Sequence, residues 1–269
     1  MDMRKSNLDI VNVSILALIS FGFFLGKWLF SFYNFPNEDL IYKLIIDSHE
    51  DSAMYFHYIK SIVEFDFNNN FSPEINEKGL MVVPIGSIIF HVFGLKLLGI
   101  SSFIILEFLA IFSFLIIFFL IFKKFAVSDI FAISISSIIF VSPLIFSYIN
   151  FLNLEEINTF SNNFYNLRFP RPLIAHLYFF VFIYILILSS YNNFYEKKIL
   201  IPLSIILSLS FSSFFFIFIN QIISILIVLT IRYKSSLLKE ISLNKKNIFY
   251  SVSMFLLLSL PFLILIFKA

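Results

Sequence analysis

Residues 100–122 read ISSFIILEFLAIFSFLIIFFLIF and are followed directly by Lys123 and Lys124. Eighteen of these residues are Ile, Leu or Phe. At roughly −0.4 kcal/mol each, they contribute about −7 kcal/mol to membrane insertion, which outweighs a cost of roughly +3 kcal/mol for the single acid, Glu107. A run of this length also matches the thickness of the hydrocarbon core of a bilayer. The stretch therefore predicts a transmembrane helix that ends at a pair of lysines.

The rest of the sequence has the same apolar character. Of 269 residues, 59% are hydrophobic and only 13% are charged, which is more apolar surface than a soluble domain of this size can bury. No ten-residue alternation indicates a β-barrel. The absence of cysteine excludes disulfides, thiol nucleophiles and cysteine-ligated metals. We therefore predict an all-α, polytopic membrane protein with apolar runs at residues 10–32, 100–122, 129–149, 173–191, 199–231 and 248–267.

The basic residues indicate how these runs cross the membrane, because cytoplasmic loops carry an excess of Lys and Arg. Residues 80–93 are short for a crossing and contain Pro84 and Gly86, whereas residues 199–231 are too long for one crossing and have a polar centre. If the first segment does not cross and the second is a hairpin of two short helices, all basic clusters lie on one side. These clusters are Arg4 with Lys5, Lys123 with Lys124, Lys197 with Lys198, and residues 232–246.

This topology has about seven transmembrane helices, a cytoplasmic amino terminus with an uncleaved first span, and juxtamembrane helices in the first outer loop. The two polar connections, a first outer loop at residues 34–99 and a second at residues 150–172, then lie on the same outer face. Trp28 and Tyr33, near the outer end of the first span, are typical of an interfacial aromatic belt.

The first outer loop is acidic: residues 34–78 contain nine acidic side chains and three lysines. Ser48 and Asp51 have the spacing of a capping box, which predicts a helix that begins near Glu50. The helix is amphipathic and suits the membrane surface, since its apolar stripe (Tyr55, Ile59, Ile62, Val63) lies apart from its polar face (His57, Lys60, Glu64). Two interpretations of Glu50 and Asp51 stay open. In the first, the two carboxylates stabilise the helix through its dipole. In the second, they provide a general base or ligands for a divalent metal.

The second outer loop carries Arg168 and Arg171 just before the span at residues 173–191. Guanidinium groups bind phosphate with two parallel hydrogen bonds and cost less to desolvate than ammonium groups. The arginines are therefore candidates for binding a lipid-linked phosphate, and ordinary contact with phospholipid headgroups is the alternative.

Four further polar residues lie within apolar segments or at their edges. Glu107 is an acid within a predicted span and is a functional candidate on that ground, or else it is close enough to the outer interface to be wetted. His57, His91 and His176 are too scattered for a recognisable zinc motif.

The order of these features resembles the opening of GT-C-type glycosyltransferases. In that superfamily an Asp-Asp or Asp-Glu pair precedes a Tyr-rich helix, which here matches Glu50-Asp51-Ser-Ala-Met-Tyr-Phe-His-Tyr-Ile59. A Pro-led juxtamembrane helix ending in Phe-Gly follows, as in Val83-Pro-Ile-Gly-Ser-Ile-Ile-Phe-His-Val-Phe-Gly94. Residues 199–231 resemble the family's paired short helices, and Leu260-Pro261-Phe262 resembles its Leu-Pro-aromatic signature. Glu50 replaces the usual Asp, and serines replace the glycines of the short-helix pair.

The resemblance covers residues 1–269 as one module, the amino-terminal part of an enzyme type that usually continues with further spans. It implies an integral protein of the bacterial inner (plasma) membrane. Such an enzyme transfers a sugar from a polyprenyl-phosphate donor to a lipid or glycan acceptor on the outer, periplasmic face, as in the synthesis of cell-envelope polysaccharide. The expected partners are the donor, the acceptor and membrane lipids, and no nucleic acid.

The resemblance also implies roles for particular residues. Asp51, assisted by Glu50, is the expected catalytic base or metal contact, and the expected cofactor is at most a divalent cation, Mg²⁺ or Mn²⁺. The donor phosphate is expected at Arg168 and Arg171. Two further acids match a second acidic site that some family members carry in this loop; they are Glu155 and Glu156.

Two other classes of function fit the same sequence. A transporter or flippase of lipid-linked glycans also uses broken helices and polar groups near the membrane midplane. A non-catalytic fragment or a subunit of a split glycosyltransferase fits a chain that stops shortly after its last apolar run.

Overall fold

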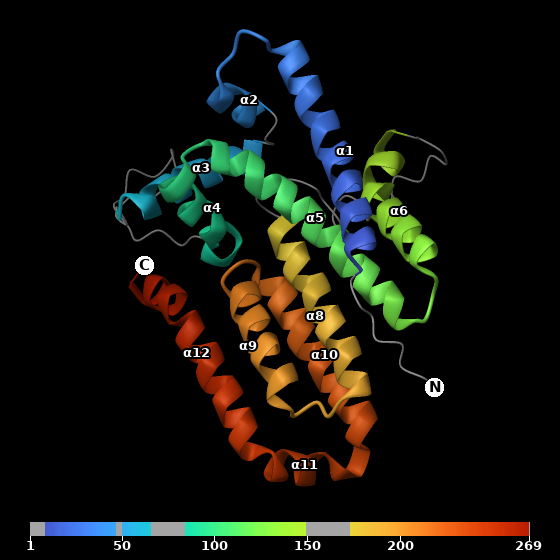
Figure 1. Cartoon of the computed structure of the whole chain (residues 1–269). Helices are drawn as coiled ribbons and strands as arrows, with labels where there is room; N and C mark the ends of the chain where they lie inside the picture. Colours follow the sequence, from blue (N-terminus) through green and yellow to red (C-terminus); the bar gives the residue numbers. More distant parts are fainter. Residues whose placement is uncertain (1–8, 47–49, 66–83, 149–172, 269) are drawn as a thin grey trace. The chain divides into compact units, whose positions relative to one another are not determined.

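The computed structural model describes residues 9–46, 50–65, 84–148 and 173–268, and within these ranges every regular element is a helix (Figure 1). This agrees with the predicted all-α class. Helices are expected in lipid because each segment must satisfy its backbone hydrogen bonds internally. The elements are α1 (Ile10–Asn34), α2 (Leu40–Ile46), α3 (Glu50–Val63), α4 (Ile85–Leu98), α5 (Ser101–Lys124), α6 (Asp129–Tyr148), α8 (Leu173–Tyr191), α9 (Lys197–Phe211), α10 (Phe215–Tyr233), η1 (Lys234–Ser236), α11 (Leu237–Leu243) and α12 (Lys245–Lys268).

Five helical stretches in the described part of the chain are long and apolar enough to cross a membrane, which marks the chain as a membrane protein. They are α1, α5, α8, the stretch Phe215–Leu243, which comprises α10, η1 and α11, and the part of α12 from Lys245 to Ile264. The helix α4 is shorter, with 14 residues, and so is the part of α6 between Asp129 and Ser142.

The contacts divide the chain into two units, of which the first comprises Met1–Ile59 and Phe90–Leu177. In this unit α5 packs against both α1 and α6, and Phe114, Leu115 and Phe119 of α5 are fully buried. At one end of these helices the Asn12 side chain donates a hydrogen bond of 2.8 Å to Asp129, which also pairs with Lys123. The start of α1 therefore lies beside the α5–α6 turn, as expected if both lie on one side of the membrane.

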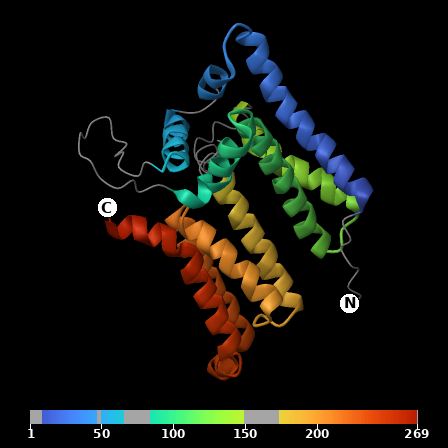
Figure 2. The same ribbon diagram turned by 60° about the vertical axis from the view of Figure 1, so that its left-hand side comes forward.

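The second unit comprises Lys60–Ile89 and Tyr178–Ala269. Here α9 packs along α12 and against α10, and both views show the three helices side by side (Figures 1 and 2). Serines line the α9–α12 contact: the Ser208 and Ser259 Oγ atoms lie 3.0 Å apart, and Ser204 is hydrogen-bonded to Ser251. Small side chains of this kind let helix backbones approach closely in a membrane.

The predicted division of residues 199–231 into two helices is confirmed. The helices α9 and α10 are joined by residues 212–214, and Ser212 and Ser213 are buried at this turn. The polar centre of the segment is therefore where the chain reverses. A further predicted boundary, the start of the last span at residue 248, lies three residues inside α12.

The first turn of α4 is seated on the α9–α10 turn. The Gly86 amide donates a hydrogen bond of 3.1 Å to the Ser212 carbonyl, and the Tyr178 hydroxyl donates one of 2.6 Å to the Gly86 carbonyl. A Cβ atom on Gly86 would lie 2.5 Å from the Ser212 and Ser213 Oγ atoms, so only glycine fits. As predicted, Pro84 directly precedes this helix. The helix continues to Leu98, beyond the predicted end at residue 93, and stops before Gly99, whose φ of +66° suits a helix end.

The seat of Gly86 gives a stability prediction. Gly86→Ala places a methyl group where serine hydroxyls already lie, and we expect the free energy of unfolding to fall by about 1–3 kcal/mol. The measurement is reversible unfolding of the detergent-solubilised full chain. Gly22→Ala is the matched control, because nothing lies within 4 Å of its Cβ position and alanine favours the helix. Equal loss of stability in the two variants would contradict this account.

Candidate functional site

The predicted acid pair lies at a helix start. The helix α3 begins at Glu50, so Glu50 and Asp51 occupy its first turn, although their side chains lie outside the described residues. The predicted amphipathic pattern is confirmed further along the helix, where Ile59 is fully buried and His57, Lys60 and Glu64 are exposed. Acidic residues in the first turn of a helix interact favourably with the helix dipole.

The other predicted site residues, Arg168, Arg171, Glu155 and Glu156, all lie outside the described residues. What the structure does give is the element that follows them: α8 begins at Leu173, as predicted. One turn into this helix His176 is buried, and its Nδ1 atom has no hydrogen-bond partner among the described residues.

Glu107 does not lie in a wetted position. Its side chain is 5% exposed and accepts a hydrogen bond of 3.0 Å from the indole Nε1 of Trp28. The interpretation of Glu107 as an acid wetted at the interface is therefore wrong. The placement of Trp28 in an interfacial belt is wrong as well, because the indole is 3% exposed and faces α5, whereas Tyr33 is 84% exposed. The pair joins α1 to α5 within the first unit, and sequence reasoning did not connect residues so far apart.

A second group of buried polar side chains lies on the α9–α10 hairpin. Gln221 of α10 is fully buried, and neither its carbonyl oxygen nor its amide nitrogen has a partner among the described residues. The same holds for the hydroxyls of Ser210 and Ser213. A carboxamide offers two donors and an acceptor, so this hairpin has hydrogen-bonding capacity inside an otherwise apolar unit.

No group of three or more His, Cys, Asp or Glu side chains able to hold a metal occurs among the residues that the structure describes. A divalent cation would therefore depend on Glu50 and Asp51, together with acids such as Glu155 and Glu156. Carboxylate oxygens are suitable ligands for Mg²⁺ and Mn²⁺. The carboxylate ligands thus suit the predicted cation. Their side chains lie outside the described residues.

No family model, curated protein or solved structure matches the chain. The described residues define a helical membrane protein with two compact units, in which every regular element is a helix. The resemblance to GT-C-type glycosyltransferases stays a prediction, and it is carried by the order of the acid pair, the Pro84-led helix and the paired helices α9 and α10.

The contact between Trp28 and Glu107 can be tested by a double-mutant cycle with Trp28→Phe and Glu107→Met. We expect a coupling energy of about 0.6–1.7 kcal/mol, the range for hydrogen bonds between membrane helices. The measurement is the free energy of unfolding of the four chains in mixed micelles.

Lys60 and Glu64 provide the control cycle, since they lie 3.9 Å apart and are 69% and 57% exposed. Exposed pairs contribute roughly 0.3–0.5 kcal/mol at this spacing. A Trp28–Glu107 coupling no larger than that of the control pair would show that the buried contact does not stabilise the fold.

Proposed function

We propose that the chain is a GT-C-type membrane glycosyltransferase that transfers a sugar from a polyprenyl-phosphate donor to a lipid or glycan acceptor. The observation that carries the proposal is the acid pair in the first turn of the amphipathic helix α3, followed in the chain by the Pro84-led helix α4. The two-helix form of residues 197–233 also fits the paired short helices of that superfamily. A further point of agreement is Pro261, which lies inside α12 as part of Leu260-Pro261-Phe262.

In the proposed reaction Asp51 accepts the proton of the acceptor hydroxyl as that oxygen attacks the anomeric carbon of the donor sugar. The bond between this carbon and the phosphate oxygen breaks, and polyprenyl phosphate leaves with the bonding electrons. Attack opposite the leaving group inverts the configuration. Glu50 assists by holding the acceptor or a divalent cation, Mg²⁺ or Mn²⁺.

The leaving phosphate gains negative charge, and cationic groups nearby lower the barrier to its departure. Arg168 and Arg171 take this role, since a guanidinium binds phosphate oxygens through two hydrogen bonds and stays charged. Glu155 and Glu156 are the proposed second acidic site.

The proposed topology has seven spans, in which α6 and α9 cross in addition to the five long apolar stretches. The amino terminus is then cytoplasmic, and residues 34–99 and 150–172 are on the outer face of a bacterial inner membrane. The contacts of Asn12 with Asp129, and of Arg232 with the Asn192 carbonyl, support this arrangement because each joins segments that the topology puts on one side.

A transporter of lipid-linked glycans is the second candidate, favoured by one observation. Gln221 and two serines are buried on the α9–α10 hairpin without partners among the described residues, and polar groups inside a membrane often mark a substrate path. A transporter moves the lipid without breaking the sugar–phosphate bond, so the products distinguish the two.

The test uses the full chain in vesicles with a donor labelled in its sugar. We expect release of polyprenyl phosphate, and a loss of about 10²–10⁴-fold in transfer for Asp51→Asn, the contribution typical of a general base. Glu64→Gln is the matched control, since Glu64 follows the same helix and is exposed to solvent.

Unfolding in mixed micelles shows whether the Asp51→Asn chain keeps its fold. Full activity of that variant would remove Asp51 from the site. Movement of intact donor across the bilayer with no bond cleavage would favour the transporter.

A further inference from the structure

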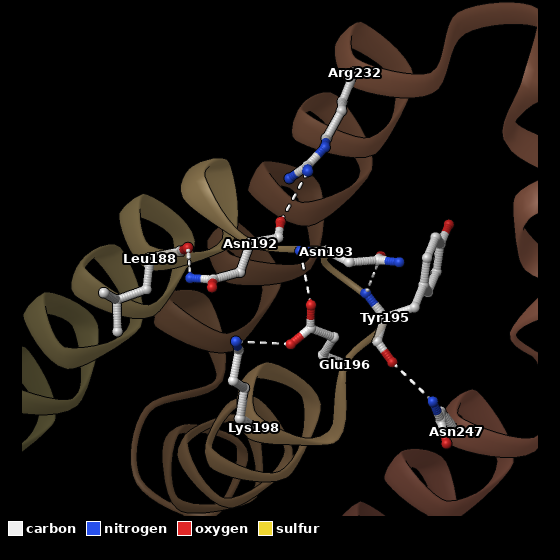
Figure 3. A network of polar contacts seen from close by, with 8 residues as sticks. All are labelled: Leu188, Asn192, Asn193, Tyr195, Glu196, Lys198, Arg232 and Asn247. Carbon is white, nitrogen blue, oxygen red and sulfur yellow. Dashed lines mark hydrogen bonds and ion pairs between the residues drawn. The ribbon is translucent and has the colours of Figure 1, made fainter. Parts of the chain in front are cut away.

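Two connections of the second unit are joined into one surface. The Arg232 guanidinium donates a hydrogen bond of 2.8 Å to the Asn192 carbonyl, in the α8–α9 connection (Figure 3). It donates a second one to the Ser189 carbonyl, in the last turn of α8. From the start of α12, the Asn247 amide donates one of 3.1 Å to the Tyr195 carbonyl (Figure 3). These contacts fix the α8–α9 connection beside residues 232–247, so the two connections lie at the same end of the unit.

Residues 234–246 comprise the connection between α10 and α12 and the first two residues of α12. The connection lies across the ends of those helices (Figure 1). Lys234 breaks the helical path, with φ at 42° and ψ at −122°, and the turn redirects the chain into η1 and α11. Both α10 and α12 are long and apolar enough to cross a bilayer. A segment that joins the ends of two such helices lies where the hydrocarbon core gives way to the headgroups.

This segment is strongly basic. Lys234, Lys239, Lys245 and Lys246 are all exposed, against the single acid Glu240. Among the described residues no carboxylate lies within ion-pair distance of these four lysines, whereas Lys198 pairs with Glu196 at 2.8 Å. The Lys198 ammonium also donates a hydrogen bond to the Glu196 carboxylate, and this hydrogen bond lowers the pKa of that carboxyl group. The four lysines therefore present positive charge that no carboxylate in the described part of the chain neutralises.

Apolar side chains are exposed between the lysines. Leu238 is 81% exposed and Leu243 is 69% exposed, and both lie on α11. Lysines alone would suit a connection surrounded by water, but leucines at this exposure are costly there, at roughly 25 cal/mol for each Å² of apolar surface. A combination of leucines and lysines is typical of helices that lie in the plane of the membrane interface.

We propose that residues 234–246 form a binding surface for the headgroups of anionic phospholipids, with Leu238 and Leu243 inserted between the upper acyl chains. Charge complementarity favours anionic lipid as the ligand, because each lysine near an anionic leaflet strengthens binding about fivefold. The proposal does not depend on the glycosyltransferase assignment.

The experiment exploits the absence of cysteine from the chain. Leu238→Cys in the full chain carries an environment-sensitive fluorophore, and the protein is placed in vesicles that contain equal amounts of phosphatidylglycerol and phosphatidylcholine. One of the two lipids is brominated near the headgroup, so quenching reports which lipid lies beside α11. We expect brominated phosphatidylglycerol to be enriched about fivefold near the probe, and the enrichment to fall in 1 M salt, where the Debye length is about 3 Å.

The matched variants remove two charges each. Lys239→Gln with Lys246→Gln is expected to reduce the enrichment to about twofold, because Lys234 and Lys245 remain. Lys60→Gln with Lys96→Gln, at exposed positions on α3 and α4, is expected to retain it. Equal quenching by the two lipids with the four lysines intact would overturn the proposal, since it would show contact with the bilayer but no preference for anionic headgroups. Absence of quenching by either lipid would overturn it as well, since α11 would then lie in water or against a protein partner. An equal loss in both double variants would show an effect of net charge alone.

Discussion

The constraint on which the structure depends is the need to satisfy every backbone hydrogen bond inside each apolar segment. In lipid an unpaired amide or carbonyl costs several kcal/mol, and only helices and closed barrels avoid that cost. Hydrophobic side chains gain little from contact with one another there, because lipid is equally apolar. The sequence can therefore be rich in Ile, Leu and Phe along every helix. The few polar and small residues then determine which helices pack against one another.

Each unit shows this choice. In the first, Trp28 and Glu107 join α1 to α5, and Asn12 with Asp129 joins the helix ends. In the second, pairs of serines join α9 to α12, and Gly86 lets the first turn of α4 touch the turn between α9 and α10. Hydrogen bonds between membrane helices are individually modest, so their value lies in specifying which helices meet and in which register.

Helix positions could be predicted from the sequence where local signals decide them. Residues 173–191 form a helix with the expected bounds, and α3 has the expected buried and exposed faces, because hydropathy and periodicity are local properties. The seat of Gly86 was not predicted, since it depends on contacts with residues distant in sequence. Helix α11 was not predicted either, because its seven residues lie within a segment whose basic charge indicates a connection. Of the candidate site, the position of the acid pair at a helix start was predicted, because the capping-box spacing of Ser48 and Asp51 is a local signal. The other predicted site residues lie outside the described residues.

The central functional proposal is that Asp51 of the first outer loop and Arg168 and Arg171 of the second act at one site. It is tested most directly by crosslinking Ser52→Cys with Phe169→Cys in membrane vesicles, using a short bismaleimide on a chain with no other cysteine. The account predicts an intramolecular crosslink for this pair and none for Ser52→Cys with Ser235→Cys, which the topology puts on opposite sides. Failure of the first pair to crosslink, with both cysteines reactive, would contradict it.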